Sequence, residues 1–60
     1  MNGKLKELRE RKNLTQAELA RKIGVNRSYI SRIESGKSKP SLALLERIAN
    51  ELGISVKKFF

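Results

Sequence analysis

The sequence predicts an all-α fold, a compact bundle of five short helices, and three observations support this fold class. Apolar residues recur every three or four positions in successive short segments, which is the period of a helix with one buried face. Serine, threonine or asparagine precedes most of these segments and can cap a helix N-terminus. Glycine follows several of them, and its left-handed backbone conformation commonly ends a helix.

The first helix is expected over residues 4 to 12, where Leu5 and Leu8 share one face. Arg9 falls in the same apolar stripe, and a buried guanidinium is costly unless a carboxylate pairs with it. Glu34, at the edge of the inner face of a later helix, is the natural partner. We therefore expect a structural ion pair between Arg9 and Glu34 that holds the first helix against the third.

The second helix is expected to begin near Gln16. Thr15 and Glu18 have the spacing of a capping box, in which the threonine oxygen and the glutamate carboxylate each accept a free backbone N–H. Gly24 can supply the left-handed residue that ends the helix, and Val25 can fold back on its last turn. The predicted buried stripe consists of Leu19, Ala20 and Ile23.

The third helix is expected from Arg27 to about Ser35, with Asn26 as its N-cap and Gly36 ending it. Only about three residues then separate the second helix from the third, a connection typical of a helix-turn-helix. So short a turn makes the two helices cross steeply. The predicted helix-turn-helix unit covers about residues 15–35.

A basic loop, "GKSKPS", leads to the fourth helix. Pro40 restricts the backbone there, and Ser41 can cap the helix that follows. Its apolar stripe is predicted to contain Leu42, Leu45, Ile48, Ala49 and Leu52. Gly53 repeats the ending signal, and Ser55 can cap a fifth, short helix that ends at Phe59 and Phe60.

The composition limits the possible functions. A chain of 60 residues has room for one domain, which we expect to span residues 1–60. It has no cysteine and no histidine, so it lacks thiol chemistry, the usual metal ligands and the usual proton shuttle. We therefore expect no enzyme, no metal, no cofactor and no small-molecule substrate.

The charge is strongly positive, at +8 with a pI near 10.5, which favours binding to polyanions. No apolar run approaches the roughly 18 residues of a membrane span, and no signal peptide is apparent. The expected location is the cytoplasm. Charge alone does not distinguish DNA, RNA and anionic membranes as partners.

The third helix carries polar side chains on the side that faces away from the predicted core. Ile30 and Ile33 mark its inner face, and at about 100° per residue the outward arc contains Ser28, Ser31, Arg32 and Ser35. Arg27 and Tyr29 flank this arc. Arginine can present two donors to guanine, serine can donate or accept, and tyrosine can contact a thymine methyl or a phosphate.

The segment "LTQAELARKIGVNRSYISRIESGKSKPS" resembles the helix-turn-helix of the phage Cro and C1 repressor family of transcriptional regulators. The likeness continues through "LLERIANELGIS" and covers nearly the whole chain. It implies a λ-repressor-like fold of five short helices, in which the second and third bind double-stranded DNA. It further implies a sequence-specific transcriptional regulator, with repression as the expected mode.

The same resemblance assigns DNA contacts to individual residues. It implies that the leading base readers are Arg27, Ser28 and Arg32, with Ser31 and Tyr29 as auxiliary contacts. It implies that Gln16 contacts a phosphate and a neighbouring recognition side chain, and that Asn26, Lys37 and Lys39 hold phosphates. This chain lacks the run of glutamines of the phage repressors, so their operator sequences do not transfer.

Several alternatives stay open at this point. Tyr29 is as compatible with partial burial as with a DNA contact, and Lys37 and Lys39 could be loop solubilisers. Another class of function is a protein-interaction module, such as an antitoxin or an adaptor. Related repressors meet their partner at the carboxy-terminal edge, so we expect a homodimer on DNA joined through Val56, Phe59 or Phe60.

Overall fold

The computed structural model describes residues 3–60 and is all-helical over that range, as the sequence predicts. The first two residues of the predicted 1–60 domain, Met1 and Asn2, lie outside the described residues. Four α-helices are followed by one short 3-10 helix. Their bounds are Lys4–Arg11 for α1, Gln16–Ile23 for α2, Arg27–Glu34 for α3, Leu42–Leu52 for α4 and Val56–Phe59 for the 3-10 helix η1.

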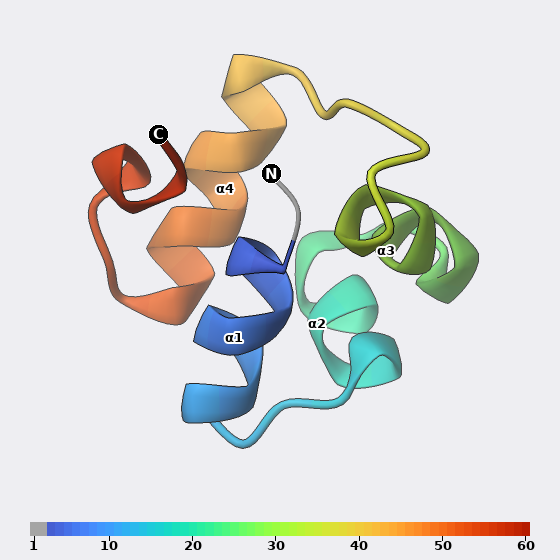
Figure 1. Cartoon of the computed structure of the whole chain (residues 1–60). Helices are drawn as coiled ribbons and strands as arrows, with labels where there is room; N and C mark the ends of the chain where they lie inside the picture. The colour runs from blue at the N-terminus through green and yellow to red at the C-terminus, as the bar shows by residue number, and fades with distance from the viewer. Residues whose placement is uncertain (1–2) are drawn as a thin grey trace.

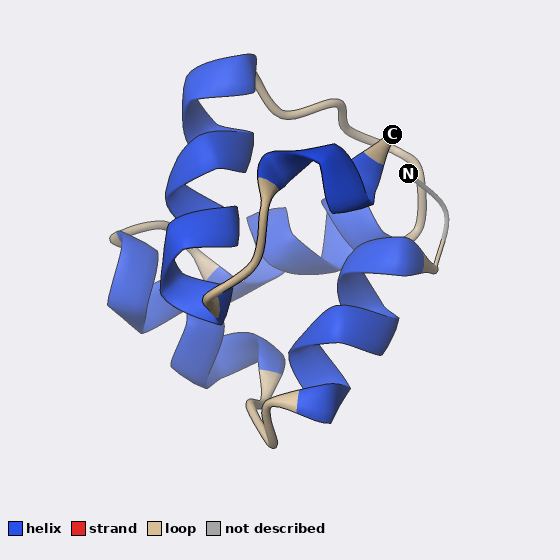
Figure 2. Ribbon diagram, turned by 90° about the vertical axis from the view of Figure 1, so that its left-hand side faces the viewer, coloured by secondary structure: helices blue, strands red, loops and turns tan. Residues whose placement is uncertain are grey.

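The helices surround one apolar core. Helix α2 packs against α3 on one side of the molecule, α4 lies on the other side, and η1 packs on the outside of α4 (Figure 1). Figure 2, turned by 90°, shows the same helices joined by short loops, with a longer loop between α3 and α4. The core residues are Leu5, Leu8, Leu19, Ala20, Ile23, Ile30, Ile33, Leu45, Ile48, Ala49, Leu52 and Phe59.

The predicted signals at both ends of α2 are confirmed. The Thr15 Oγ1 accepts from the Glu18 backbone N–H at 3.0 Å, and a Glu18 carboxylate oxygen accepts from the Thr15 N–H at 2.8 Å. At the other end Gly24 adopts φ 77°, and the Val25 N–H donates to the Ala20 carbonyl at 2.9 Å. These bonds satisfy backbone groups that the helix itself leaves free.

The turn between α2 and α3 has the predicted length and the predicted N-cap residue. Asn26 occupies the N-cap position of α3, and its side chain makes no capping hydrogen bond. Its backbone carbonyl accepts from the Tyr29 and Ile30 N–H groups instead. The predicted N-cap position of Asn26 is therefore confirmed, without a side-chain capping bond, and the exposed Asn26 amide lies beside free N–H groups in the first turn of α3.

The predicted fifth helix is wrong in type. Over Val56–Phe59 the backbone makes 3-10 bonds, from Lys58 N–H to the Ser55 carbonyl and from Phe60 N–H to the Lys57 carbonyl. Four residues are too few to offset the cost of nucleating an α-helix. Ser55 caps this segment as predicted, since its Oγ accepts from the Lys57 N–H at 3.3 Å.

Helix α4 has the predicted cap and a shorter buried stripe than predicted. The Ser41 Oγ accepts from the Leu44 N–H at 3.2 Å. Leu42 was expected in the apolar stripe but is 58% exposed. Leu44, off the predicted stripe, is half-buried against the core.

Candidate nucleic-acid interface

Helix α3 presents its polar side chains to solvent because its apolar side is fully buried in the core. Ile30 and Ile33 have no exposed surface, so the opposite side of α3 faces outward. Among the predicted base readers, Arg27, Ser28 and Arg32 are exposed, whereas Tyr29 and Ser31 are half-buried. The Ser35 hydroxyl, on the same arc, donates to the Arg32 carbonyl at 3.1 Å, and Ser35 is the C-cap of α3.

Tyr29 is half-buried, so the structure bears out the partial burial that the sequence allowed for it. Its ring packs partly against the core, and the Arg32 guanidinium lies 5.9 Å from the ring centroid. A cation over an aromatic face is attracted by the ring quadrupole. The contact restrains Arg32 while leaving its N–H donors in the plane of the guanidinium free for a base or a phosphate.

The Arg9 and Glu34 side chains meet beneath this surface, as the isolated charge on α1 predicts. The Arg9 Nε donates to the Glu34 Oε2 at 2.7 Å, and the Arg9 Nη2 donates to the Glu34 Oε1 at 3.2 Å. A third donor, the Arg9 Nη1, bonds to the Leu14 carbonyl at 2.6 Å. The hydrogen bond that Arg9 donates to Glu34 raises the pKa of Arg9, so the guanidinium stays charged.

Gln16 connects this buried pair to the surface. Its Nε2 donates to the Glu34 Oε1 at 3.0 Å, and its Oε1 accepts from the Arg27 Nη1 at 3.5 Å. The contact between Gln16 and Arg27 puts the N-termini of α2 and α3 at the same end of the unit. Sequence reasoning missed the bond between Gln16 and Glu34, because no local pattern relates residues 18 positions apart on different helices.

The four residues that the sequence assigns to phosphates lie around α3. Gln16 is half-buried at the start of α2, and Asn26 is exposed just before α3. Lys37 and Lys39 are exposed in the loop after α3. The Lys37 N–H donates to the Arg32 carbonyl at 2.8 Å, so this loop folds back on the end of the helix.

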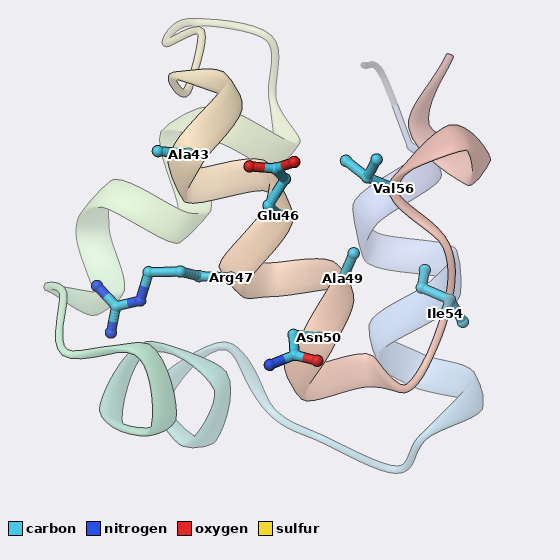
Figure 3. Close-up of a pocket in the computed structure, with 7 residues that line it drawn as sticks. All are labelled: Ala43, Glu46, Arg47, Ala49, Asn50, Ile54 and Val56. Atoms are coloured by element: carbon cyan, nitrogen blue, oxygen red, sulfur yellow. The ribbon is translucent and has the colours of Figure 1, made fainter.

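A separate groove lies between α4 and η1, away from the α3 face (Figure 3). Ala49, Ile54 and Val56 face one another across it, while the Arg47 side chain points away from this apolar wall. Glu46 also lines the groove. Its lining therefore combines an apolar wall with one charge of each sign.

The described residues offer no other obvious chemical site. Over residues 3–60 the structure has no group of three or more acidic residues, cysteines or histidines that could hold a metal ion. In the same range no helix is both long and apolar enough to cross a membrane.

Comparison with known proteins identifies the family. The family model described as helix-turn-helix matches residues 5–59. The chain belongs to this family. Among its relatives is an uncharacterized HTH-type transcriptional regulator of Methanocaldococcus jannaschii, 47% identical over 60 residues that cover 100% of this chain and 91% of that protein.

Further relatives come from phage and from solved structures. The immunity repressor protein of Bacillus phage phi105 is 43% identical over 53 residues, which cover 88% of this chain and 37% of that protein. A crystal structure of SinR, described as the master regulator for biofilm formation in complex with DNA, matches with a TM-score of 0.91 at 34% identity. The match covers 100% of each chain. The predicted resemblance to helix-turn-helix transcriptional regulators, which bind DNA, is therefore confirmed at the level of the family.

Proposed function

We propose that this chain reads specific double-stranded DNA with α3 in the major groove and regulates transcription by occupying its site. Residues 1–60 would act as one DNA-binding domain, with residues 15–35 as its helix-turn-helix unit. The observation that carries the proposal is the exposed row of Arg27, Ser28 and Arg32 on a helix whose opposite side is fully buried. The major groove accepts one helix of this kind.

In this proposal the bases are read mainly from the outer side of α3. Arg27 and Arg32 offer paired donors suited to guanine O6 and N7, and Ser28 donates or accepts. Ser31 and Tyr29 make auxiliary contacts, since each is half-buried and has less surface to offer. The two arginines would therefore contribute most of the sequence discrimination.

Phosphate contacts would come from both sides of α3. Gln16 and Asn26 stand at the N-terminal ends of α2 and α3, where free backbone N–H groups favour an anion. Lys37 and Lys39 would follow the backbone past the other end of α3. These contacts set the register without reading bases, and they make binding weaker at high salt.

The proposed mode of action is repression by site occupation in the cytoplasm, without catalysis or a cofactor. The exposed row on α3 comes from a helix of eight residues, so one copy reads few base pairs. We therefore propose a homodimer on DNA, with half-sites about one helical turn, ~10 base pairs, apart.

The surface around Val56 and Phe60 supports pairing of two copies. Phe60 is 82% exposed, whereas Phe59 is 8% exposed and belongs to the core of its own chain. The adjacent groove carries one charge of each sign, Glu46 and Arg47. In a two-fold interface any contact between these residues of two copies would occur twice. Phe59, named in the sequence-based prediction, is thus a less suitable contact than Phe60.

Selection of binding sites from a random duplex library at two salt concentrations tests this function. We expect one enriched motif with two-fold symmetry, and weaker binding to all sequences at the higher salt. Equal affinity for the selected and random duplexes would contradict the proposal and favour a protein-interaction module instead.

A further inference from the structure

We infer that Glu34, which is not itself a proposed DNA contact, is a positioning residue for base reading, because it orients the Gln16 amide that holds Arg27. The inference rests on the proposed function and adds to it a residue buried behind the surface. Four hydrogen bonds carry it, and they run without a break from the core to the outer side of α3.

The orientation of the Gln16 amide follows from its two neighbours. Its N–H group faces the Glu34 carboxylate at 3.0 Å, and its carbonyl oxygen faces the Arg27 guanidinium at 3.5 Å. A carboxylate only accepts hydrogen bonds and a guanidinium only donates them. A flipped amide would set oxygen against oxygen on one side and donor against donor on the other, so Glu34 determines which end meets Arg27.

Glu34 can orient Gln16 because it is itself held rigidly. Arg9 binds both of its carboxylate oxygens, and the side chains of Arg9 and Glu34 are 8% and 5% exposed. Arg9 is fixed in turn by the Leu14 carbonyl. Hydrogen bonds therefore hold Glu34, at the buried end of the network, against α1. Arg27, at its outer end, is exposed.

The long hydrogen bond between Gln16 and Arg27 can restrain the Arg27 side chain without holding it away from DNA. At 3.5 Å the hydrogen bond is weak, so Arg27 can leave it for a base at little cost. A restrained arginine also loses less rotamer freedom on binding than a free one does. Glu34 would thus favour contact between Arg27 and its base without forming a DNA contact of its own.

Replacement of Glu34 by glutamine has a specific consequence. Glu34→Gln supplies one oxygen where the native carboxylate supplies two, and Arg9 demands both acceptor positions. If the new NH2 group takes the place of Oε1, it faces both Gln16 and the Arg9 Nη2, so Arg9 loses an acceptor there and the Gln16 amide must flip and present its own NH2 group to Arg27. If it faces the Arg9 Nε instead, the buried guanidinium loses a partner and the carboxylate end of the network loosens.

The test measures dissociation constants for the selected duplex and for duplexes changed at the base pair that Arg27 reads. For Glu34→Gln we expect discrimination at that base pair to fall about three- to tenfold, the effect of one lost hydrogen bond, and discrimination elsewhere to be kept. Gln16→Met, which keeps the ion pair between Arg9 and Glu34, should show the same selective loss of discrimination, added to a uniform loss of affinity from its missing phosphate contact. Ile48→Val, a core change on α4, is the matched control and should keep full discrimination.

Two outcomes would overturn the inference. One is unchanged discrimination at the Arg27 base pair in both Glu34→Gln and Gln16→Met. The other is a further loss of discrimination at that base pair when Glu34→Gln is added to Arg27→Ala, because a residue that acts through Arg27 has no effect in its absence.

A measurement without DNA separates this inference from the proposed function. In NMR spectra of the free protein, the Gln16 side-chain amide should show slow hydrogen exchange and a shifted NH2 signal that Glu34→Gln returns to the position of a solvated glutamine. A wild-type protein with no sequence preference but with this signal would refute the function and keep the network. An unshifted, fast-exchanging amide in the wild type would refute the network itself.

Discussion

Arg9 on α1 and Glu34 at the end of α3 form a buried ion pair with an Nε to Oε2 distance of 2.7 Å. It joins the N-terminal helix to the helix that carries the proposed base readers. A third N–H donor of Arg9, on Nη1, bonds to the Leu14 carbonyl. Among the residues that the structure describes, no buried side-chain nitrogen or oxygen lacks a hydrogen-bond partner.

Loss of one partner of this pair should destabilise the fold strongly. Arg9→Met leaves the Glu34 carboxylate buried and unpaired, which typically costs about 3 to 5 kcal/mol. Chemical denaturation should show this loss as a lower midpoint. The double variant Arg9→Met with Glu34→Leu should regain part of the stability, and an Arg9→Met protein as stable as the wild type would contradict the role of the pair.

Acid should weaken the N-terminal cap of α2. The hydrogen bond from the Thr15 backbone lowers the pKa of Glu18, so the folded state favours the ionised carboxylate. A lowered folded pKa gives stability that is present above the ordinary value near 4.5 and is lost as the pH falls through the folded value. A carboxylate with such a pKa titrates between about pH 5 and pH 2. Over this range the melting temperature of the wild type should fall more steeply than that of Glu18→Gln. Equal slopes would show that Glu18 does not contribute.

The residue after the C-cap of α1 should accept glycine with a gain in stability. Asn13 has φ 58°, the left-handed region that side chains with a Cβ disfavour. Asn13→Gly should stabilise the protein by roughly 0.5 to 1 kcal/mol and Asn13→Ala should destabilise it by a similar amount. Lys12→Gly is the matched control, since Lys12 has φ −94° and should gain nothing. Thermal melts of the three variants would measure whether each substitution raises or lowers the stability.

Two single substitutions should separate base reading from phosphate binding. Arg27→Ala should reduce discrimination at one base pair by about 1 to 3 kcal/mol and leave the other positions unchanged. Lys37→Ala should weaken all sequences alike and reduce the log-log salt slope by roughly 0.9. Titrations of matched and mismatched duplexes at several salt concentrations measure both effects. A uniform loss with Arg27→Ala would place that arginine on the phosphates instead.

The proposed dimer depends on the exposed Phe60 side chain. Phe60→Ser removes an aromatic surface that is 82% exposed in one copy, so it should leave the fold intact while weakening pairing on DNA. Sedimentation with a two-half-site duplex should show two copies of the wild type bound together and the variant binding in separate, weaker steps. One copy per duplex at full affinity in the wild type would refute the dimer.

Local signals predicted most of the secondary structure. The capping box of Thr15 and Glu18, the left-handed Gly24 and the Ser41 cap each involve residues within a few positions of one another, so the sequence carries them directly. The outward position of Ser28 and Arg32 also follows from helical spacing relative to Ile30 and Ile33. The assignment of these side chains to DNA bases stays a prediction.

By itself the sequence determined the helices, their caps, the polar side of α3 and the need for a partner for Arg9, because these depend on short-range spacing and on the cost of a buried charge. Only the tertiary structure decided that Gln16 bonds to Glu34, that Phe59 is buried and that Leu42 is exposed. Those features depend on how the helices cross, which brings together groups far apart in the chain. A local sequence pattern cannot predict which distant groups the crossing helices bring into contact.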